Sequence, residues 1–207
     1  MNNSTPIEQP NFEHLTKLRT ALAISQGIKL LSTLRKESEI TVSHDQAKRV
    51  TYLTELFSRI HRDIFHDWKK QATVDHRPGT MTDGKKRIQF RLIVEQLVLD
   101  ATYNEEAAIF DNNGFIINTE NIAERLADFY YKMREVRPFS YGNRITLDFF
   151  VTALGKLPAF KSVYEQGIDF RRLKAEDTAA LHDLDSSLQS IVTAFKHALD
   201  PSRIKGL

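Results

Sequence analysis

The chain contains no cysteine, a single tryptophan, and few residues that interrupt helices, with 8 glycines and 6 prolines among 207 residues. The absence of cysteine excludes a disulfide framework, a cysteine-ligated metal or iron–sulfur site, and a thiol nucleophile. Lys+Arg number 29 and Asp+Glu 27, so the net charge is +2 and lacks the excess that is typical of polyanion binders. We therefore expect no nucleic-acid partner.

Long apolar runs are also missing. The best candidate, residues 149–155 (FFVTALG), is far shorter than the roughly 18 apolar residues that span a bilayer. The residues after Met1 show no basic stretch followed by an apolar one, so we expect no Sec signal peptide. The sequence predicts a protein that does not contact membranes, located in the cytoplasm or exported into a host cell without a Sec signal.

Apolar residues recur at spacings of three and four along most of the chain, which is typical of amphipathic helices. We expect a flexible leader over residues 1–11, an N-terminal helix within 12–44, a main domain over 45–200 and a tail over 201–207. Within the main domain, a first helix is predicted from Ser43 or Asp45 to about Ile64, and a buried helix over Ile88–Leu99. Two more are predicted from Thr119 or Asn121 to Val136 and from Asn143 to about Lys156. A short helix over Lys161–Gln166 precedes one last helix, whose apolar stripe runs from Leu181 to Leu199. His61 and His66, five residues apart, are expected to face solvent rather than to bind a metal.

One β element is predicted in this helical chain. The turn sequence Asp111–Gly114 lies between Ala108–Phe110 and Phe115–Ile117, a pattern typical of a short hairpin. Because two strands alone are marginally stable, this hairpin must lie on helices. The expected fold class is therefore all-α with one small β-hairpin.

The most informative segment joins two predicted helices and reads RPFSYGNRIT over residues 137–146. A Gly-Asn turn at the start of a helix presents free backbone N–H groups and the positive end of the helix dipole, which favours an anion such as phosphate. The alternative is an ordinary helix–loop–helix connection in which Gly142 and Asn143 supply positive φ angles. The residues alone leave both interpretations open.

This segment resembles the motif of the Fic (Fido) domain family, His-Pro-Phe-x-(Asp/Glu)-Gly-Asn-Gly-Arg-Thr-x-Arg, and aligns with it without a gap. Leu56–Trp68 and Arg77–Gly79 are similar to the family's tryptophan-ended helix and Pro-Gly loop. The resemblance implies a Fic-like helical domain over residues 45–200 that transfers AMP from ATP to a hydroxyl of a target protein. It also implies that the hairpin residues Phe115, Ile116 and Ile117 form the flap that binds an extended strand of that target, whose identity the sequence does not reveal.

Five motif positions depart from the family. Arg137 replaces the histidine that acts as general base, and a guanidinium cannot accept a proton at neutral pH. Tyr141 replaces the acidic residue that holds Mg²⁺, and a neutral phenol is a poor ligand for so hard a cation. Arg144 replaces the second glycine, while Ile145 and Asp148 replace the two phosphate-binding arginines.

We therefore expect a catalytically impaired Fic-like protein that acts by binding a nucleotide, ATP or another, or a protein. The resemblance assigns Arg137, Tyr141 and Arg144 to the catalytic positions, of which Arg137 is not expected to act as a base. Gly142, Asn143, Arg144 and Thr146 are the expected nucleotide- or anion-binding residues. No metal site is predicted, because the Mg²⁺ position holds Tyr141.

Two other hypotheses stay open. The chain is an active transferase with rearranged chemistry on a nucleotide or another phosphorylated donor, in which Arg144 stabilises charge and Tyr141 acts as an acid or nucleophile. Alternatively, it is a non-enzymatic antitoxin or effector module that binds partners through the hairpin. Thr33–Ser38 is similar to the family's inhibitory helix around Glu37, or is a plain solvated helix end.

Overall fold

The computed structural model describes residues 46–66, 78–107, 119–154 and 168–203, together with positions 25, 27 and 29. Within these ranges the chain forms six α-helices, two short 3-10 turns and no strand. The elements are α2 (Gln46–Ile64), α3 (Gly84–Ala107), α4 (Thr119–Val136), α5 (Asn143–Leu154), η3 (Phe170–Arg172), α7 (Ala175–His182), α8 (Leu188–Leu199) and η4 (Pro201–Arg203). The expectation of a helical fold is confirmed for these ranges.

Several sequence predictions lie outside the described residues. They include the hairpin with Phe115, Ile116 and Ile117, the helix over residues 161–166, and the segment around Glu37. None of the helices in the described ranges is both long enough and apolar enough to cross a membrane.

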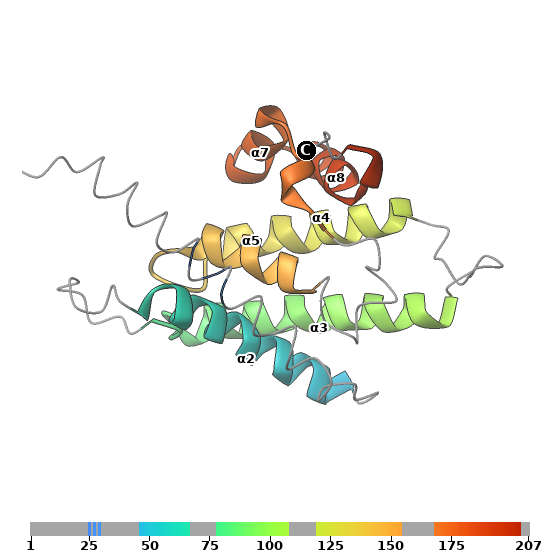
Figure 1. Cartoon of the computed structure of the whole chain (residues 1–207). Helices are drawn as coiled ribbons and strands as arrows, with labels where there is room; N and C mark the ends of the chain where they lie inside the picture. Colours follow the sequence, from blue (N-terminus) through green and yellow to red (C-terminus); the bar gives the residue numbers. More distant parts are fainter. Residues whose placement is uncertain are drawn as a thin grey trace, which may run out of the picture.

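The helices pack in three layers (Figure 1). α4 and α5 lie against each other in the middle layer. On one side α2 packs against α5, and α3 packs against α2 and α4. On the other side α8 packs against α4, and α7 packs against α8. The connection between α4 and α5, which carries the motif, therefore lies within the central layer.

An aromatic cluster holds the first two layers together. The ring of Phe57 from α2 lies 4.8 Å from Phe90 of α3, 5.3 Å from Phe139 of the α4–α5 connection and 5.1 Å from Phe150 of α5, measured between ring centroids. All four side chains are buried. Aromatic pairs at such distances contribute about 0.5–1.5 kcal/mol each beyond the area they bury. The motif loop is therefore fixed to the core through Phe139.

The bounds of three helices confirm the sequence predictions. α2 begins at Gln46, directly after the predicted cap Asp45, and α4 begins at Thr119. α4 ends at Val136, because Pro138 disfavours helical geometry at the residue before it. α5 begins at Asn143, as the Gly-Asn turn indicated.

The prediction for α3 was wrong in extent and in burial. The helix runs from Gly84 to Ala107, well beyond both ends of the predicted segment. Phe90 and Val94 point into the core, but Ile88, Leu92 and Leu99 are exposed. The run of apolar residues therefore covers two opposite sides of α3, of which only one is buried.

The prediction of a single last helix was also wrong. The chain forms α7 and α8, separated by residues 183–187, and the expected core residues Leu184 and Leu188 are exposed. The Ser187 hydroxyl accepts a hydrogen bond from the Ser190 N–H at 3.2 Å and so caps the start of α8. Arg134 of α4 binds the carbonyl groups of the break, which keeps them out of a continuous helix.

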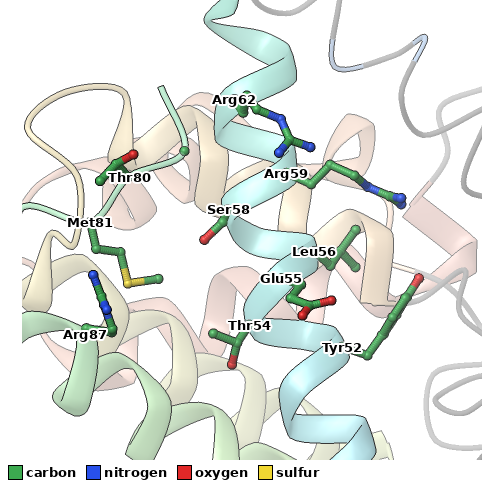
Figure 2. A pocket seen from close by; sticks show the side chains of 11 residues that line it. Tyr52, Thr54, Glu55, Leu56, Ser58, Arg59, Arg62, Thr80, Met81 and Arg87 are labelled. Atoms are coloured by element: carbon green, nitrogen blue, oxygen red, sulfur yellow. The ribbon is translucent and has the colours of Figure 1, made fainter. Parts of the chain in front are cut away.

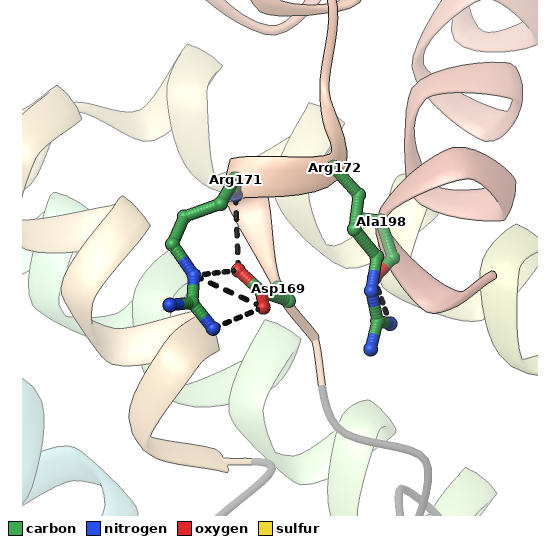
Figure 3. Close-up of polar contacts among 4 residues, drawn as sticks. All are labelled: Asp169, Arg171, Arg172 and Ala198. Atoms are coloured by element: carbon green, nitrogen blue, oxygen red, sulfur yellow. Dashed lines mark hydrogen bonds and ion pairs between the residues drawn. The ribbon is translucent and has the colours of Figure 1, made fainter. Parts of the chain in front are cut away.

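The segment that precedes α7 is tied to the end of α8. Figure 3 shows the Asp169 carboxylate accepting from the Arg171 guanidinium, and Arg172 reaching the opposite way to the Ala198 carbonyl at 2.9 Å. The Asp169 N–H also donates to the Ala198 carbonyl at 3.0 Å. Asp177 of α7 binds His197 of α8 at 2.7 Å. These contacts fix the third layer, which forms one wall of the candidate site.

Candidate functional site

The candidate site begins where α4 ends. Arg137 has a φ angle of 44°, the left-handed conformation that usually belongs to glycine at the end of a helix. Its N–H donates to the Met133 carbonyl at 3.4 Å, and its own carbonyl accepts from the Lys86 ammonium at 3.0 Å. A residue with a Cβ pays roughly 1–2 kcal/mol for this conformation. The exposed Arg137 side chain is thus held by a strained backbone.

Asn143 closes the loop that follows. Its side-chain Oδ1 accepts from the Phe139 N–H at 2.8 Å, and its Nδ2 donates to the Phe139 carbonyl at 2.7 Å. The buried Thr146 hydroxyl donates to the Gly142 carbonyl at 2.9 Å. Both residues are predicted to bind a nucleotide, but these side-chain hydrogen bonds go to backbone groups of the loop itself. Thr146 is fully buried.

Gly142 is required by packing as well as by conformation. Its φ angle is 67°, in the left-handed region. A Cβ added there would lie 2.3 Å from the ring of Phe65, which fills the space beside the glycine. The group that lies closest to Gly142 is therefore the phenyl ring of Phe65.

His61 connects the motif loop to a second loop, and the sequence prediction that it faces solvent was wrong. Its Nδ1 accepts from the Gly79 N–H at 2.8 Å, so the ring hydrogen is on Nε2, which donates to the Tyr141 carbonyl at 2.9 Å. The ring also stacks on Phe139, with 3.9 Å between centroids. Burial lowers the pKa of His61 from 6.5 to about 4, although the hydrogen bond to the Tyr141 carbonyl opposes this. His61 is therefore neutral at physiological pH.

A signal for the burial of His61 was present in the sequence. The residue lies four positions after Phe57 and three before Ile64, on the apolar face of α2. His66, in contrast, is exposed as predicted.

Tyr141 accepts the hydrogen bond from His61 with its backbone carbonyl. Its ring packs edge-on against Phe65, with 5.3 Å between centroids, and lies 5.1 Å from the ring of His61. Burial raises the pKa of its phenol above the ordinary value. Because the phenol is then even less ionised at neutral pH, it is a poor nucleophile.

Arg134 connects α4 to the segment between α7 and α8. Its buried guanidinium donates to the carbonyl groups of Asp183, Leu184 and Ser186, at 2.6, 2.9 and 2.7 Å. The side chains of Arg137 and Arg144, in contrast, are exposed.

Asp148 occupies the motif position at which the Fic family, which this segment resembles, has a phosphate-binding arginine. Its Oδ1 accepts from the Tyr130 hydroxyl at 2.7 Å, and its Oδ2 lies 3.4 Å from Nε2 of His182. Burial raises the pKa of Tyr130, and the nearby Asp148 carboxylate raises it further. The hydrogen bond between Tyr130 and Asp148 connects α4 to α5. No arginine occupies this motif position.

These elements surround a cavity of about 410 Å³, which we call the motif cavity. The loop and the start of α5 supply Arg137, Pro138, Gly142, Asn143, Arg144 and Ile145. The other walls come from α2, α4, α5 and the α7 region: Phe57, Phe65, Tyr130, Met133, Arg134, Leu147, Leu181, His182 and Leu184. Tyr141 and Thr146 are absent from this lining, while Gly142, Asn143, Arg144 and Arg137 belong to it. No three His, Asp or Glu side chains within the described ranges come together as they would to hold a metal ion.

A second cavity, of about 530 Å³, lies along α2 beside the loop around Gly79 (Figure 2). Ser58 and Thr54 point from α2 toward Met81, whereas Arg59 extends away from the helix on the other side. Arg62 and Arg87 also contribute to its lining. Gly79 belongs to this cavity and donates to His61, so the histidine joins the loops that border the two cavities.

Comparison with known proteins adds no relative: no protein-family model, no curated protein and no solved structure matches the chain. The fold and the site together define a helical protein with a cavity at a tight helix–loop–helix connection.

Proposed function

We propose that the chain is a Fic-like protein that binds a phosphate-bearing small ligand of the nucleotide class in the motif cavity, and that it does not transfer AMP. The observation that carries the proposal is the cavity at the 137–146 segment, with two exposed arginines at its lining. Ligand sites of drug-sized molecules typically enclose about 300–1,000 Å³, and the volume of 410 Å³ falls within that range.

The start of α5 supplies the groups that would receive phosphate. The N–H groups of Asn143, Arg144 and Ile145 occupy the first turn of the helix, where no described residue accepts from them. Such N–H groups and the positive end of the helix dipole favour an anion. Arg137 and Arg144 line the same cavity from the two ends of the loop, and arginine binds phosphate through a two-pronged contact.

The apolar part of the lining suits an apolar, planar group such as a nucleobase. It includes Met133, Leu147, Leu181 and Leu184, of which Leu184 keeps 44% of its surface exposed. Sites for small molecules combine mostly apolar walls with a few placed polar groups, and the motif cavity has this division.

Proton transfer is the step for which the site is least equipped. Arg137, at the position of the family's general base, cannot accept a proton at neutral pH. The buried His61 uses both ring nitrogens in hydrogen bonds to backbone groups. His182 lines the cavity with its Nε2 3.4 Å from the Asp148 carboxylate, but it does not occupy the motif position of the family's base. General base catalysis contributes about 10²–10⁴-fold, so the loss of the base at position 137 favours binding over turnover.

Calorimetric titration with AMP, ADP and ATP tests the proposal, each with Mg²⁺ and with a chelator. We expect saturable binding that does not need Mg²⁺. Arg144→Ala should weaken it by about tenfold to a hundredfold, the value of one charged hydrogen-bonding group. Arg171→Ala is the matched control, because Arg171 is an exposed arginine of η3 outside the cavity.

Three results would overturn the proposal. The first is no binding of any of these ligands, which favours a pure interaction module. The second is equal binding by the Arg144→Ala and Arg171→Ala variants. The third is saturable transfer of label from α-labelled ATP to a protein, which would make the chain an active transferase.

A further inference from the structure

His182, the last residue of α7, lines the motif cavity and lies against a carboxylate. Its side chain is 28% exposed, and its Nε2 lies 3.4 Å from Oδ2 of Asp148 on α5. The other carboxylate oxygen, Oδ1, accepts a hydrogen bond from the Tyr130 hydroxyl at 2.7 Å, and Asp148 is not among the residues that line the cavity. The imidazole therefore borders the cavity, whereas the carboxylate that it contacts does not.

The place of His182 is fixed by the residues that follow it. The Arg134 guanidinium binds the carbonyl groups of Asp183, Leu184 and Ser186, and so holds the end of α7 against α4. None of the described residues forms a hydrogen bond with Nδ1 of His182. A protonated imidazole has an N–H on each nitrogen, so Nε2 can face Asp148 while Nδ1 donates to a ligand.

Histidine is the side-chain type that changes charge between pH 5 and 8, and His182 supplies one to this cavity. Burial and the Asp148 carboxylate raise the pKa of Tyr130, so this phenol keeps its proton throughout that range. The described parts of α2 and α8 add no charged side chain to the lining. The charged or titratable groups around His182 are Tyr130 and Arg134 of α4, Arg137 of the motif loop, Arg144 and Asp148 of α5, and Asp183 next to it.

The charge of the Asp148–His182 pair beside the cavity therefore depends on pH. With a neutral ring the pair carries one negative charge, which repels a phosphate. With a protonated ring the pair is neutral, and a second N–H becomes able to donate. Arg137 and Arg144 attract a phosphate in both states, because a guanidinium stays charged.

We propose that His182 is a third cationic contact of the motif cavity and that it takes up a proton from solvent when a phosphate-bearing ligand binds. This role of His182 rests on the function proposed above, because it needs such a ligand in the cavity. Protonation of the ring and binding of the phosphate favour each other, since each stabilises the state that the other prefers. The contribution of His182 to affinity therefore grows as the pH falls from 8 to 5.5.

Calorimetric titration of the full chain with ADP in a chelator, at pH 8 and pH 5.5, tests the proposal. The terminal phosphate of ADP itself loses charge toward acid pH, so the quantity compared is the ratio of affinities between wild type and variant at each pH. Wild type and His182→Gln should bind nearly equally at pH 8, and the wild type should bind about tenfold more tightly at pH 5.5. Titration near neutral pH in buffers of different ionisation heat should show proton uptake that His182→Gln lacks.

His197→Gln is the matched control. His197 also lies against a carboxylate, with its Nδ1 2.7 Å from Asp177 and its side chain 31% exposed, but it is not among the lining residues of the motif cavity. The His197→Gln variant should match the wild type at both pH values. Far-UV circular dichroism confirms that each variant is folded.

Each possible result decides the proposal. An affinity ratio between wild type and His182→Gln that is the same at both pH values overturns the role of His182 and leaves the proposed function standing, because ADP still binds. No saturable binding at either pH overturns both. Should His182→Gln not fold, the His182 ring resonance of the wild type is titrated by NMR with and without ADP. A midpoint about one pH unit higher with ADP supports the proposal, and an unchanged midpoint overturns it.

Discussion

The burial of His61 predicts that acid destabilises the protein through a single side chain. The neutral ring accepts from the Gly79 N–H and donates to the Tyr141 carbonyl. A proton added at Nδ1 would face the Gly79 N–H instead of accepting from it. Because the ring is buried, its pKa lies at about 4 in the folded chain rather than at 6.5, although the hydrogen bond to the Tyr141 carbonyl opposes the shift.

The sign and size of the effect follow from proton linkage. Between pH 6.5 and 4 the unfolded chain binds a proton at His61 that the folded chain does not. The stabilisation is therefore complete above pH 6.5 and is lost as the pH falls toward 4. At about 1.4 kcal/mol per pKa unit the full loss is about 3 kcal/mol, of which about 2 kcal/mol is lost between pH 7 and pH 5.

Urea unfolding at pH 7, 6 and 5 measures this loss. The wild-type chain should lose about 2 kcal/mol more free energy of unfolding between pH 7 and pH 5 than His61→Gln, which has no titrating ring. His66→Gln, at an exposed position two residues after α2, should follow the wild type. Equal losses for the wild type and His61→Gln would refute the reasoning. Should His61→Gln not fold, the His61 ring resonance of the wild type, unchanged by NMR from pH 7 to pH 5, tests the same claim.

Substitutions at three further positions test the motif loop and the break between α7 and α8. Arg137→Gly should raise the free energy of unfolding by about 1 kcal/mol, because glycine adopts the left-handed conformation without strain, while Arg137→Ala should not. Asn143→Ala should cost about 1–3 kcal/mol through both hydrogen bonds to Phe139, and Asn143→Asp, which keeps the acceptor, should cost less. Arg134→Met should cost about 3 kcal/mol by removing the donor to three carbonyl groups. Unchanged thermal unfolding of Arg137→Gly, Asn143→Ala or Arg134→Met would contradict the conformation or contact that it tests.

The sequence predicted those parts of the fold that depend on local signals. The end of α4 follows from Pro138, two residues after Val136. The start of α5 follows from the turn at Gly142. These residues act on their own neighbours, so a pattern of a few positions is sufficient to find them.

Other features depend on residues far apart in the chain and could not be predicted in this way. The break between α7 and α8 is bound by Arg134, about 50 positions earlier. His61 is buried because Gly79 and Tyr141 reach it from two loops. The exposure of Ile88 on α3 depends on which side α2 and α4 cover, and an apolar run does not contain that information.

In the candidate site, too, the features set by local signals were predicted and those set by distant residues were not. Sequence reasoning found the loop, and Arg137, Gly142, Asn143 and Arg144 do line one cavity. It did not find that the ring of Phe65 fills the space at Gly142 or that Tyr141 is not among the cavity's lining residues. The rings of His61 and Phe65, which pack against this loop from the end of α2 and just after it, are not part of the motif.

The central claim is that the motif cavity binds a phosphate-bearing ligand without transferring it. Calorimetric titration of the full chain with ADP in a chelator, in parallel with Arg144→Ala and Arg171→Ala, tests it most directly. The account predicts saturable binding by the wild type and by Arg171→Ala, weakened by about tenfold or more in Arg144→Ala. An absence of saturable heat, or identical binding by the two variants, would contradict it.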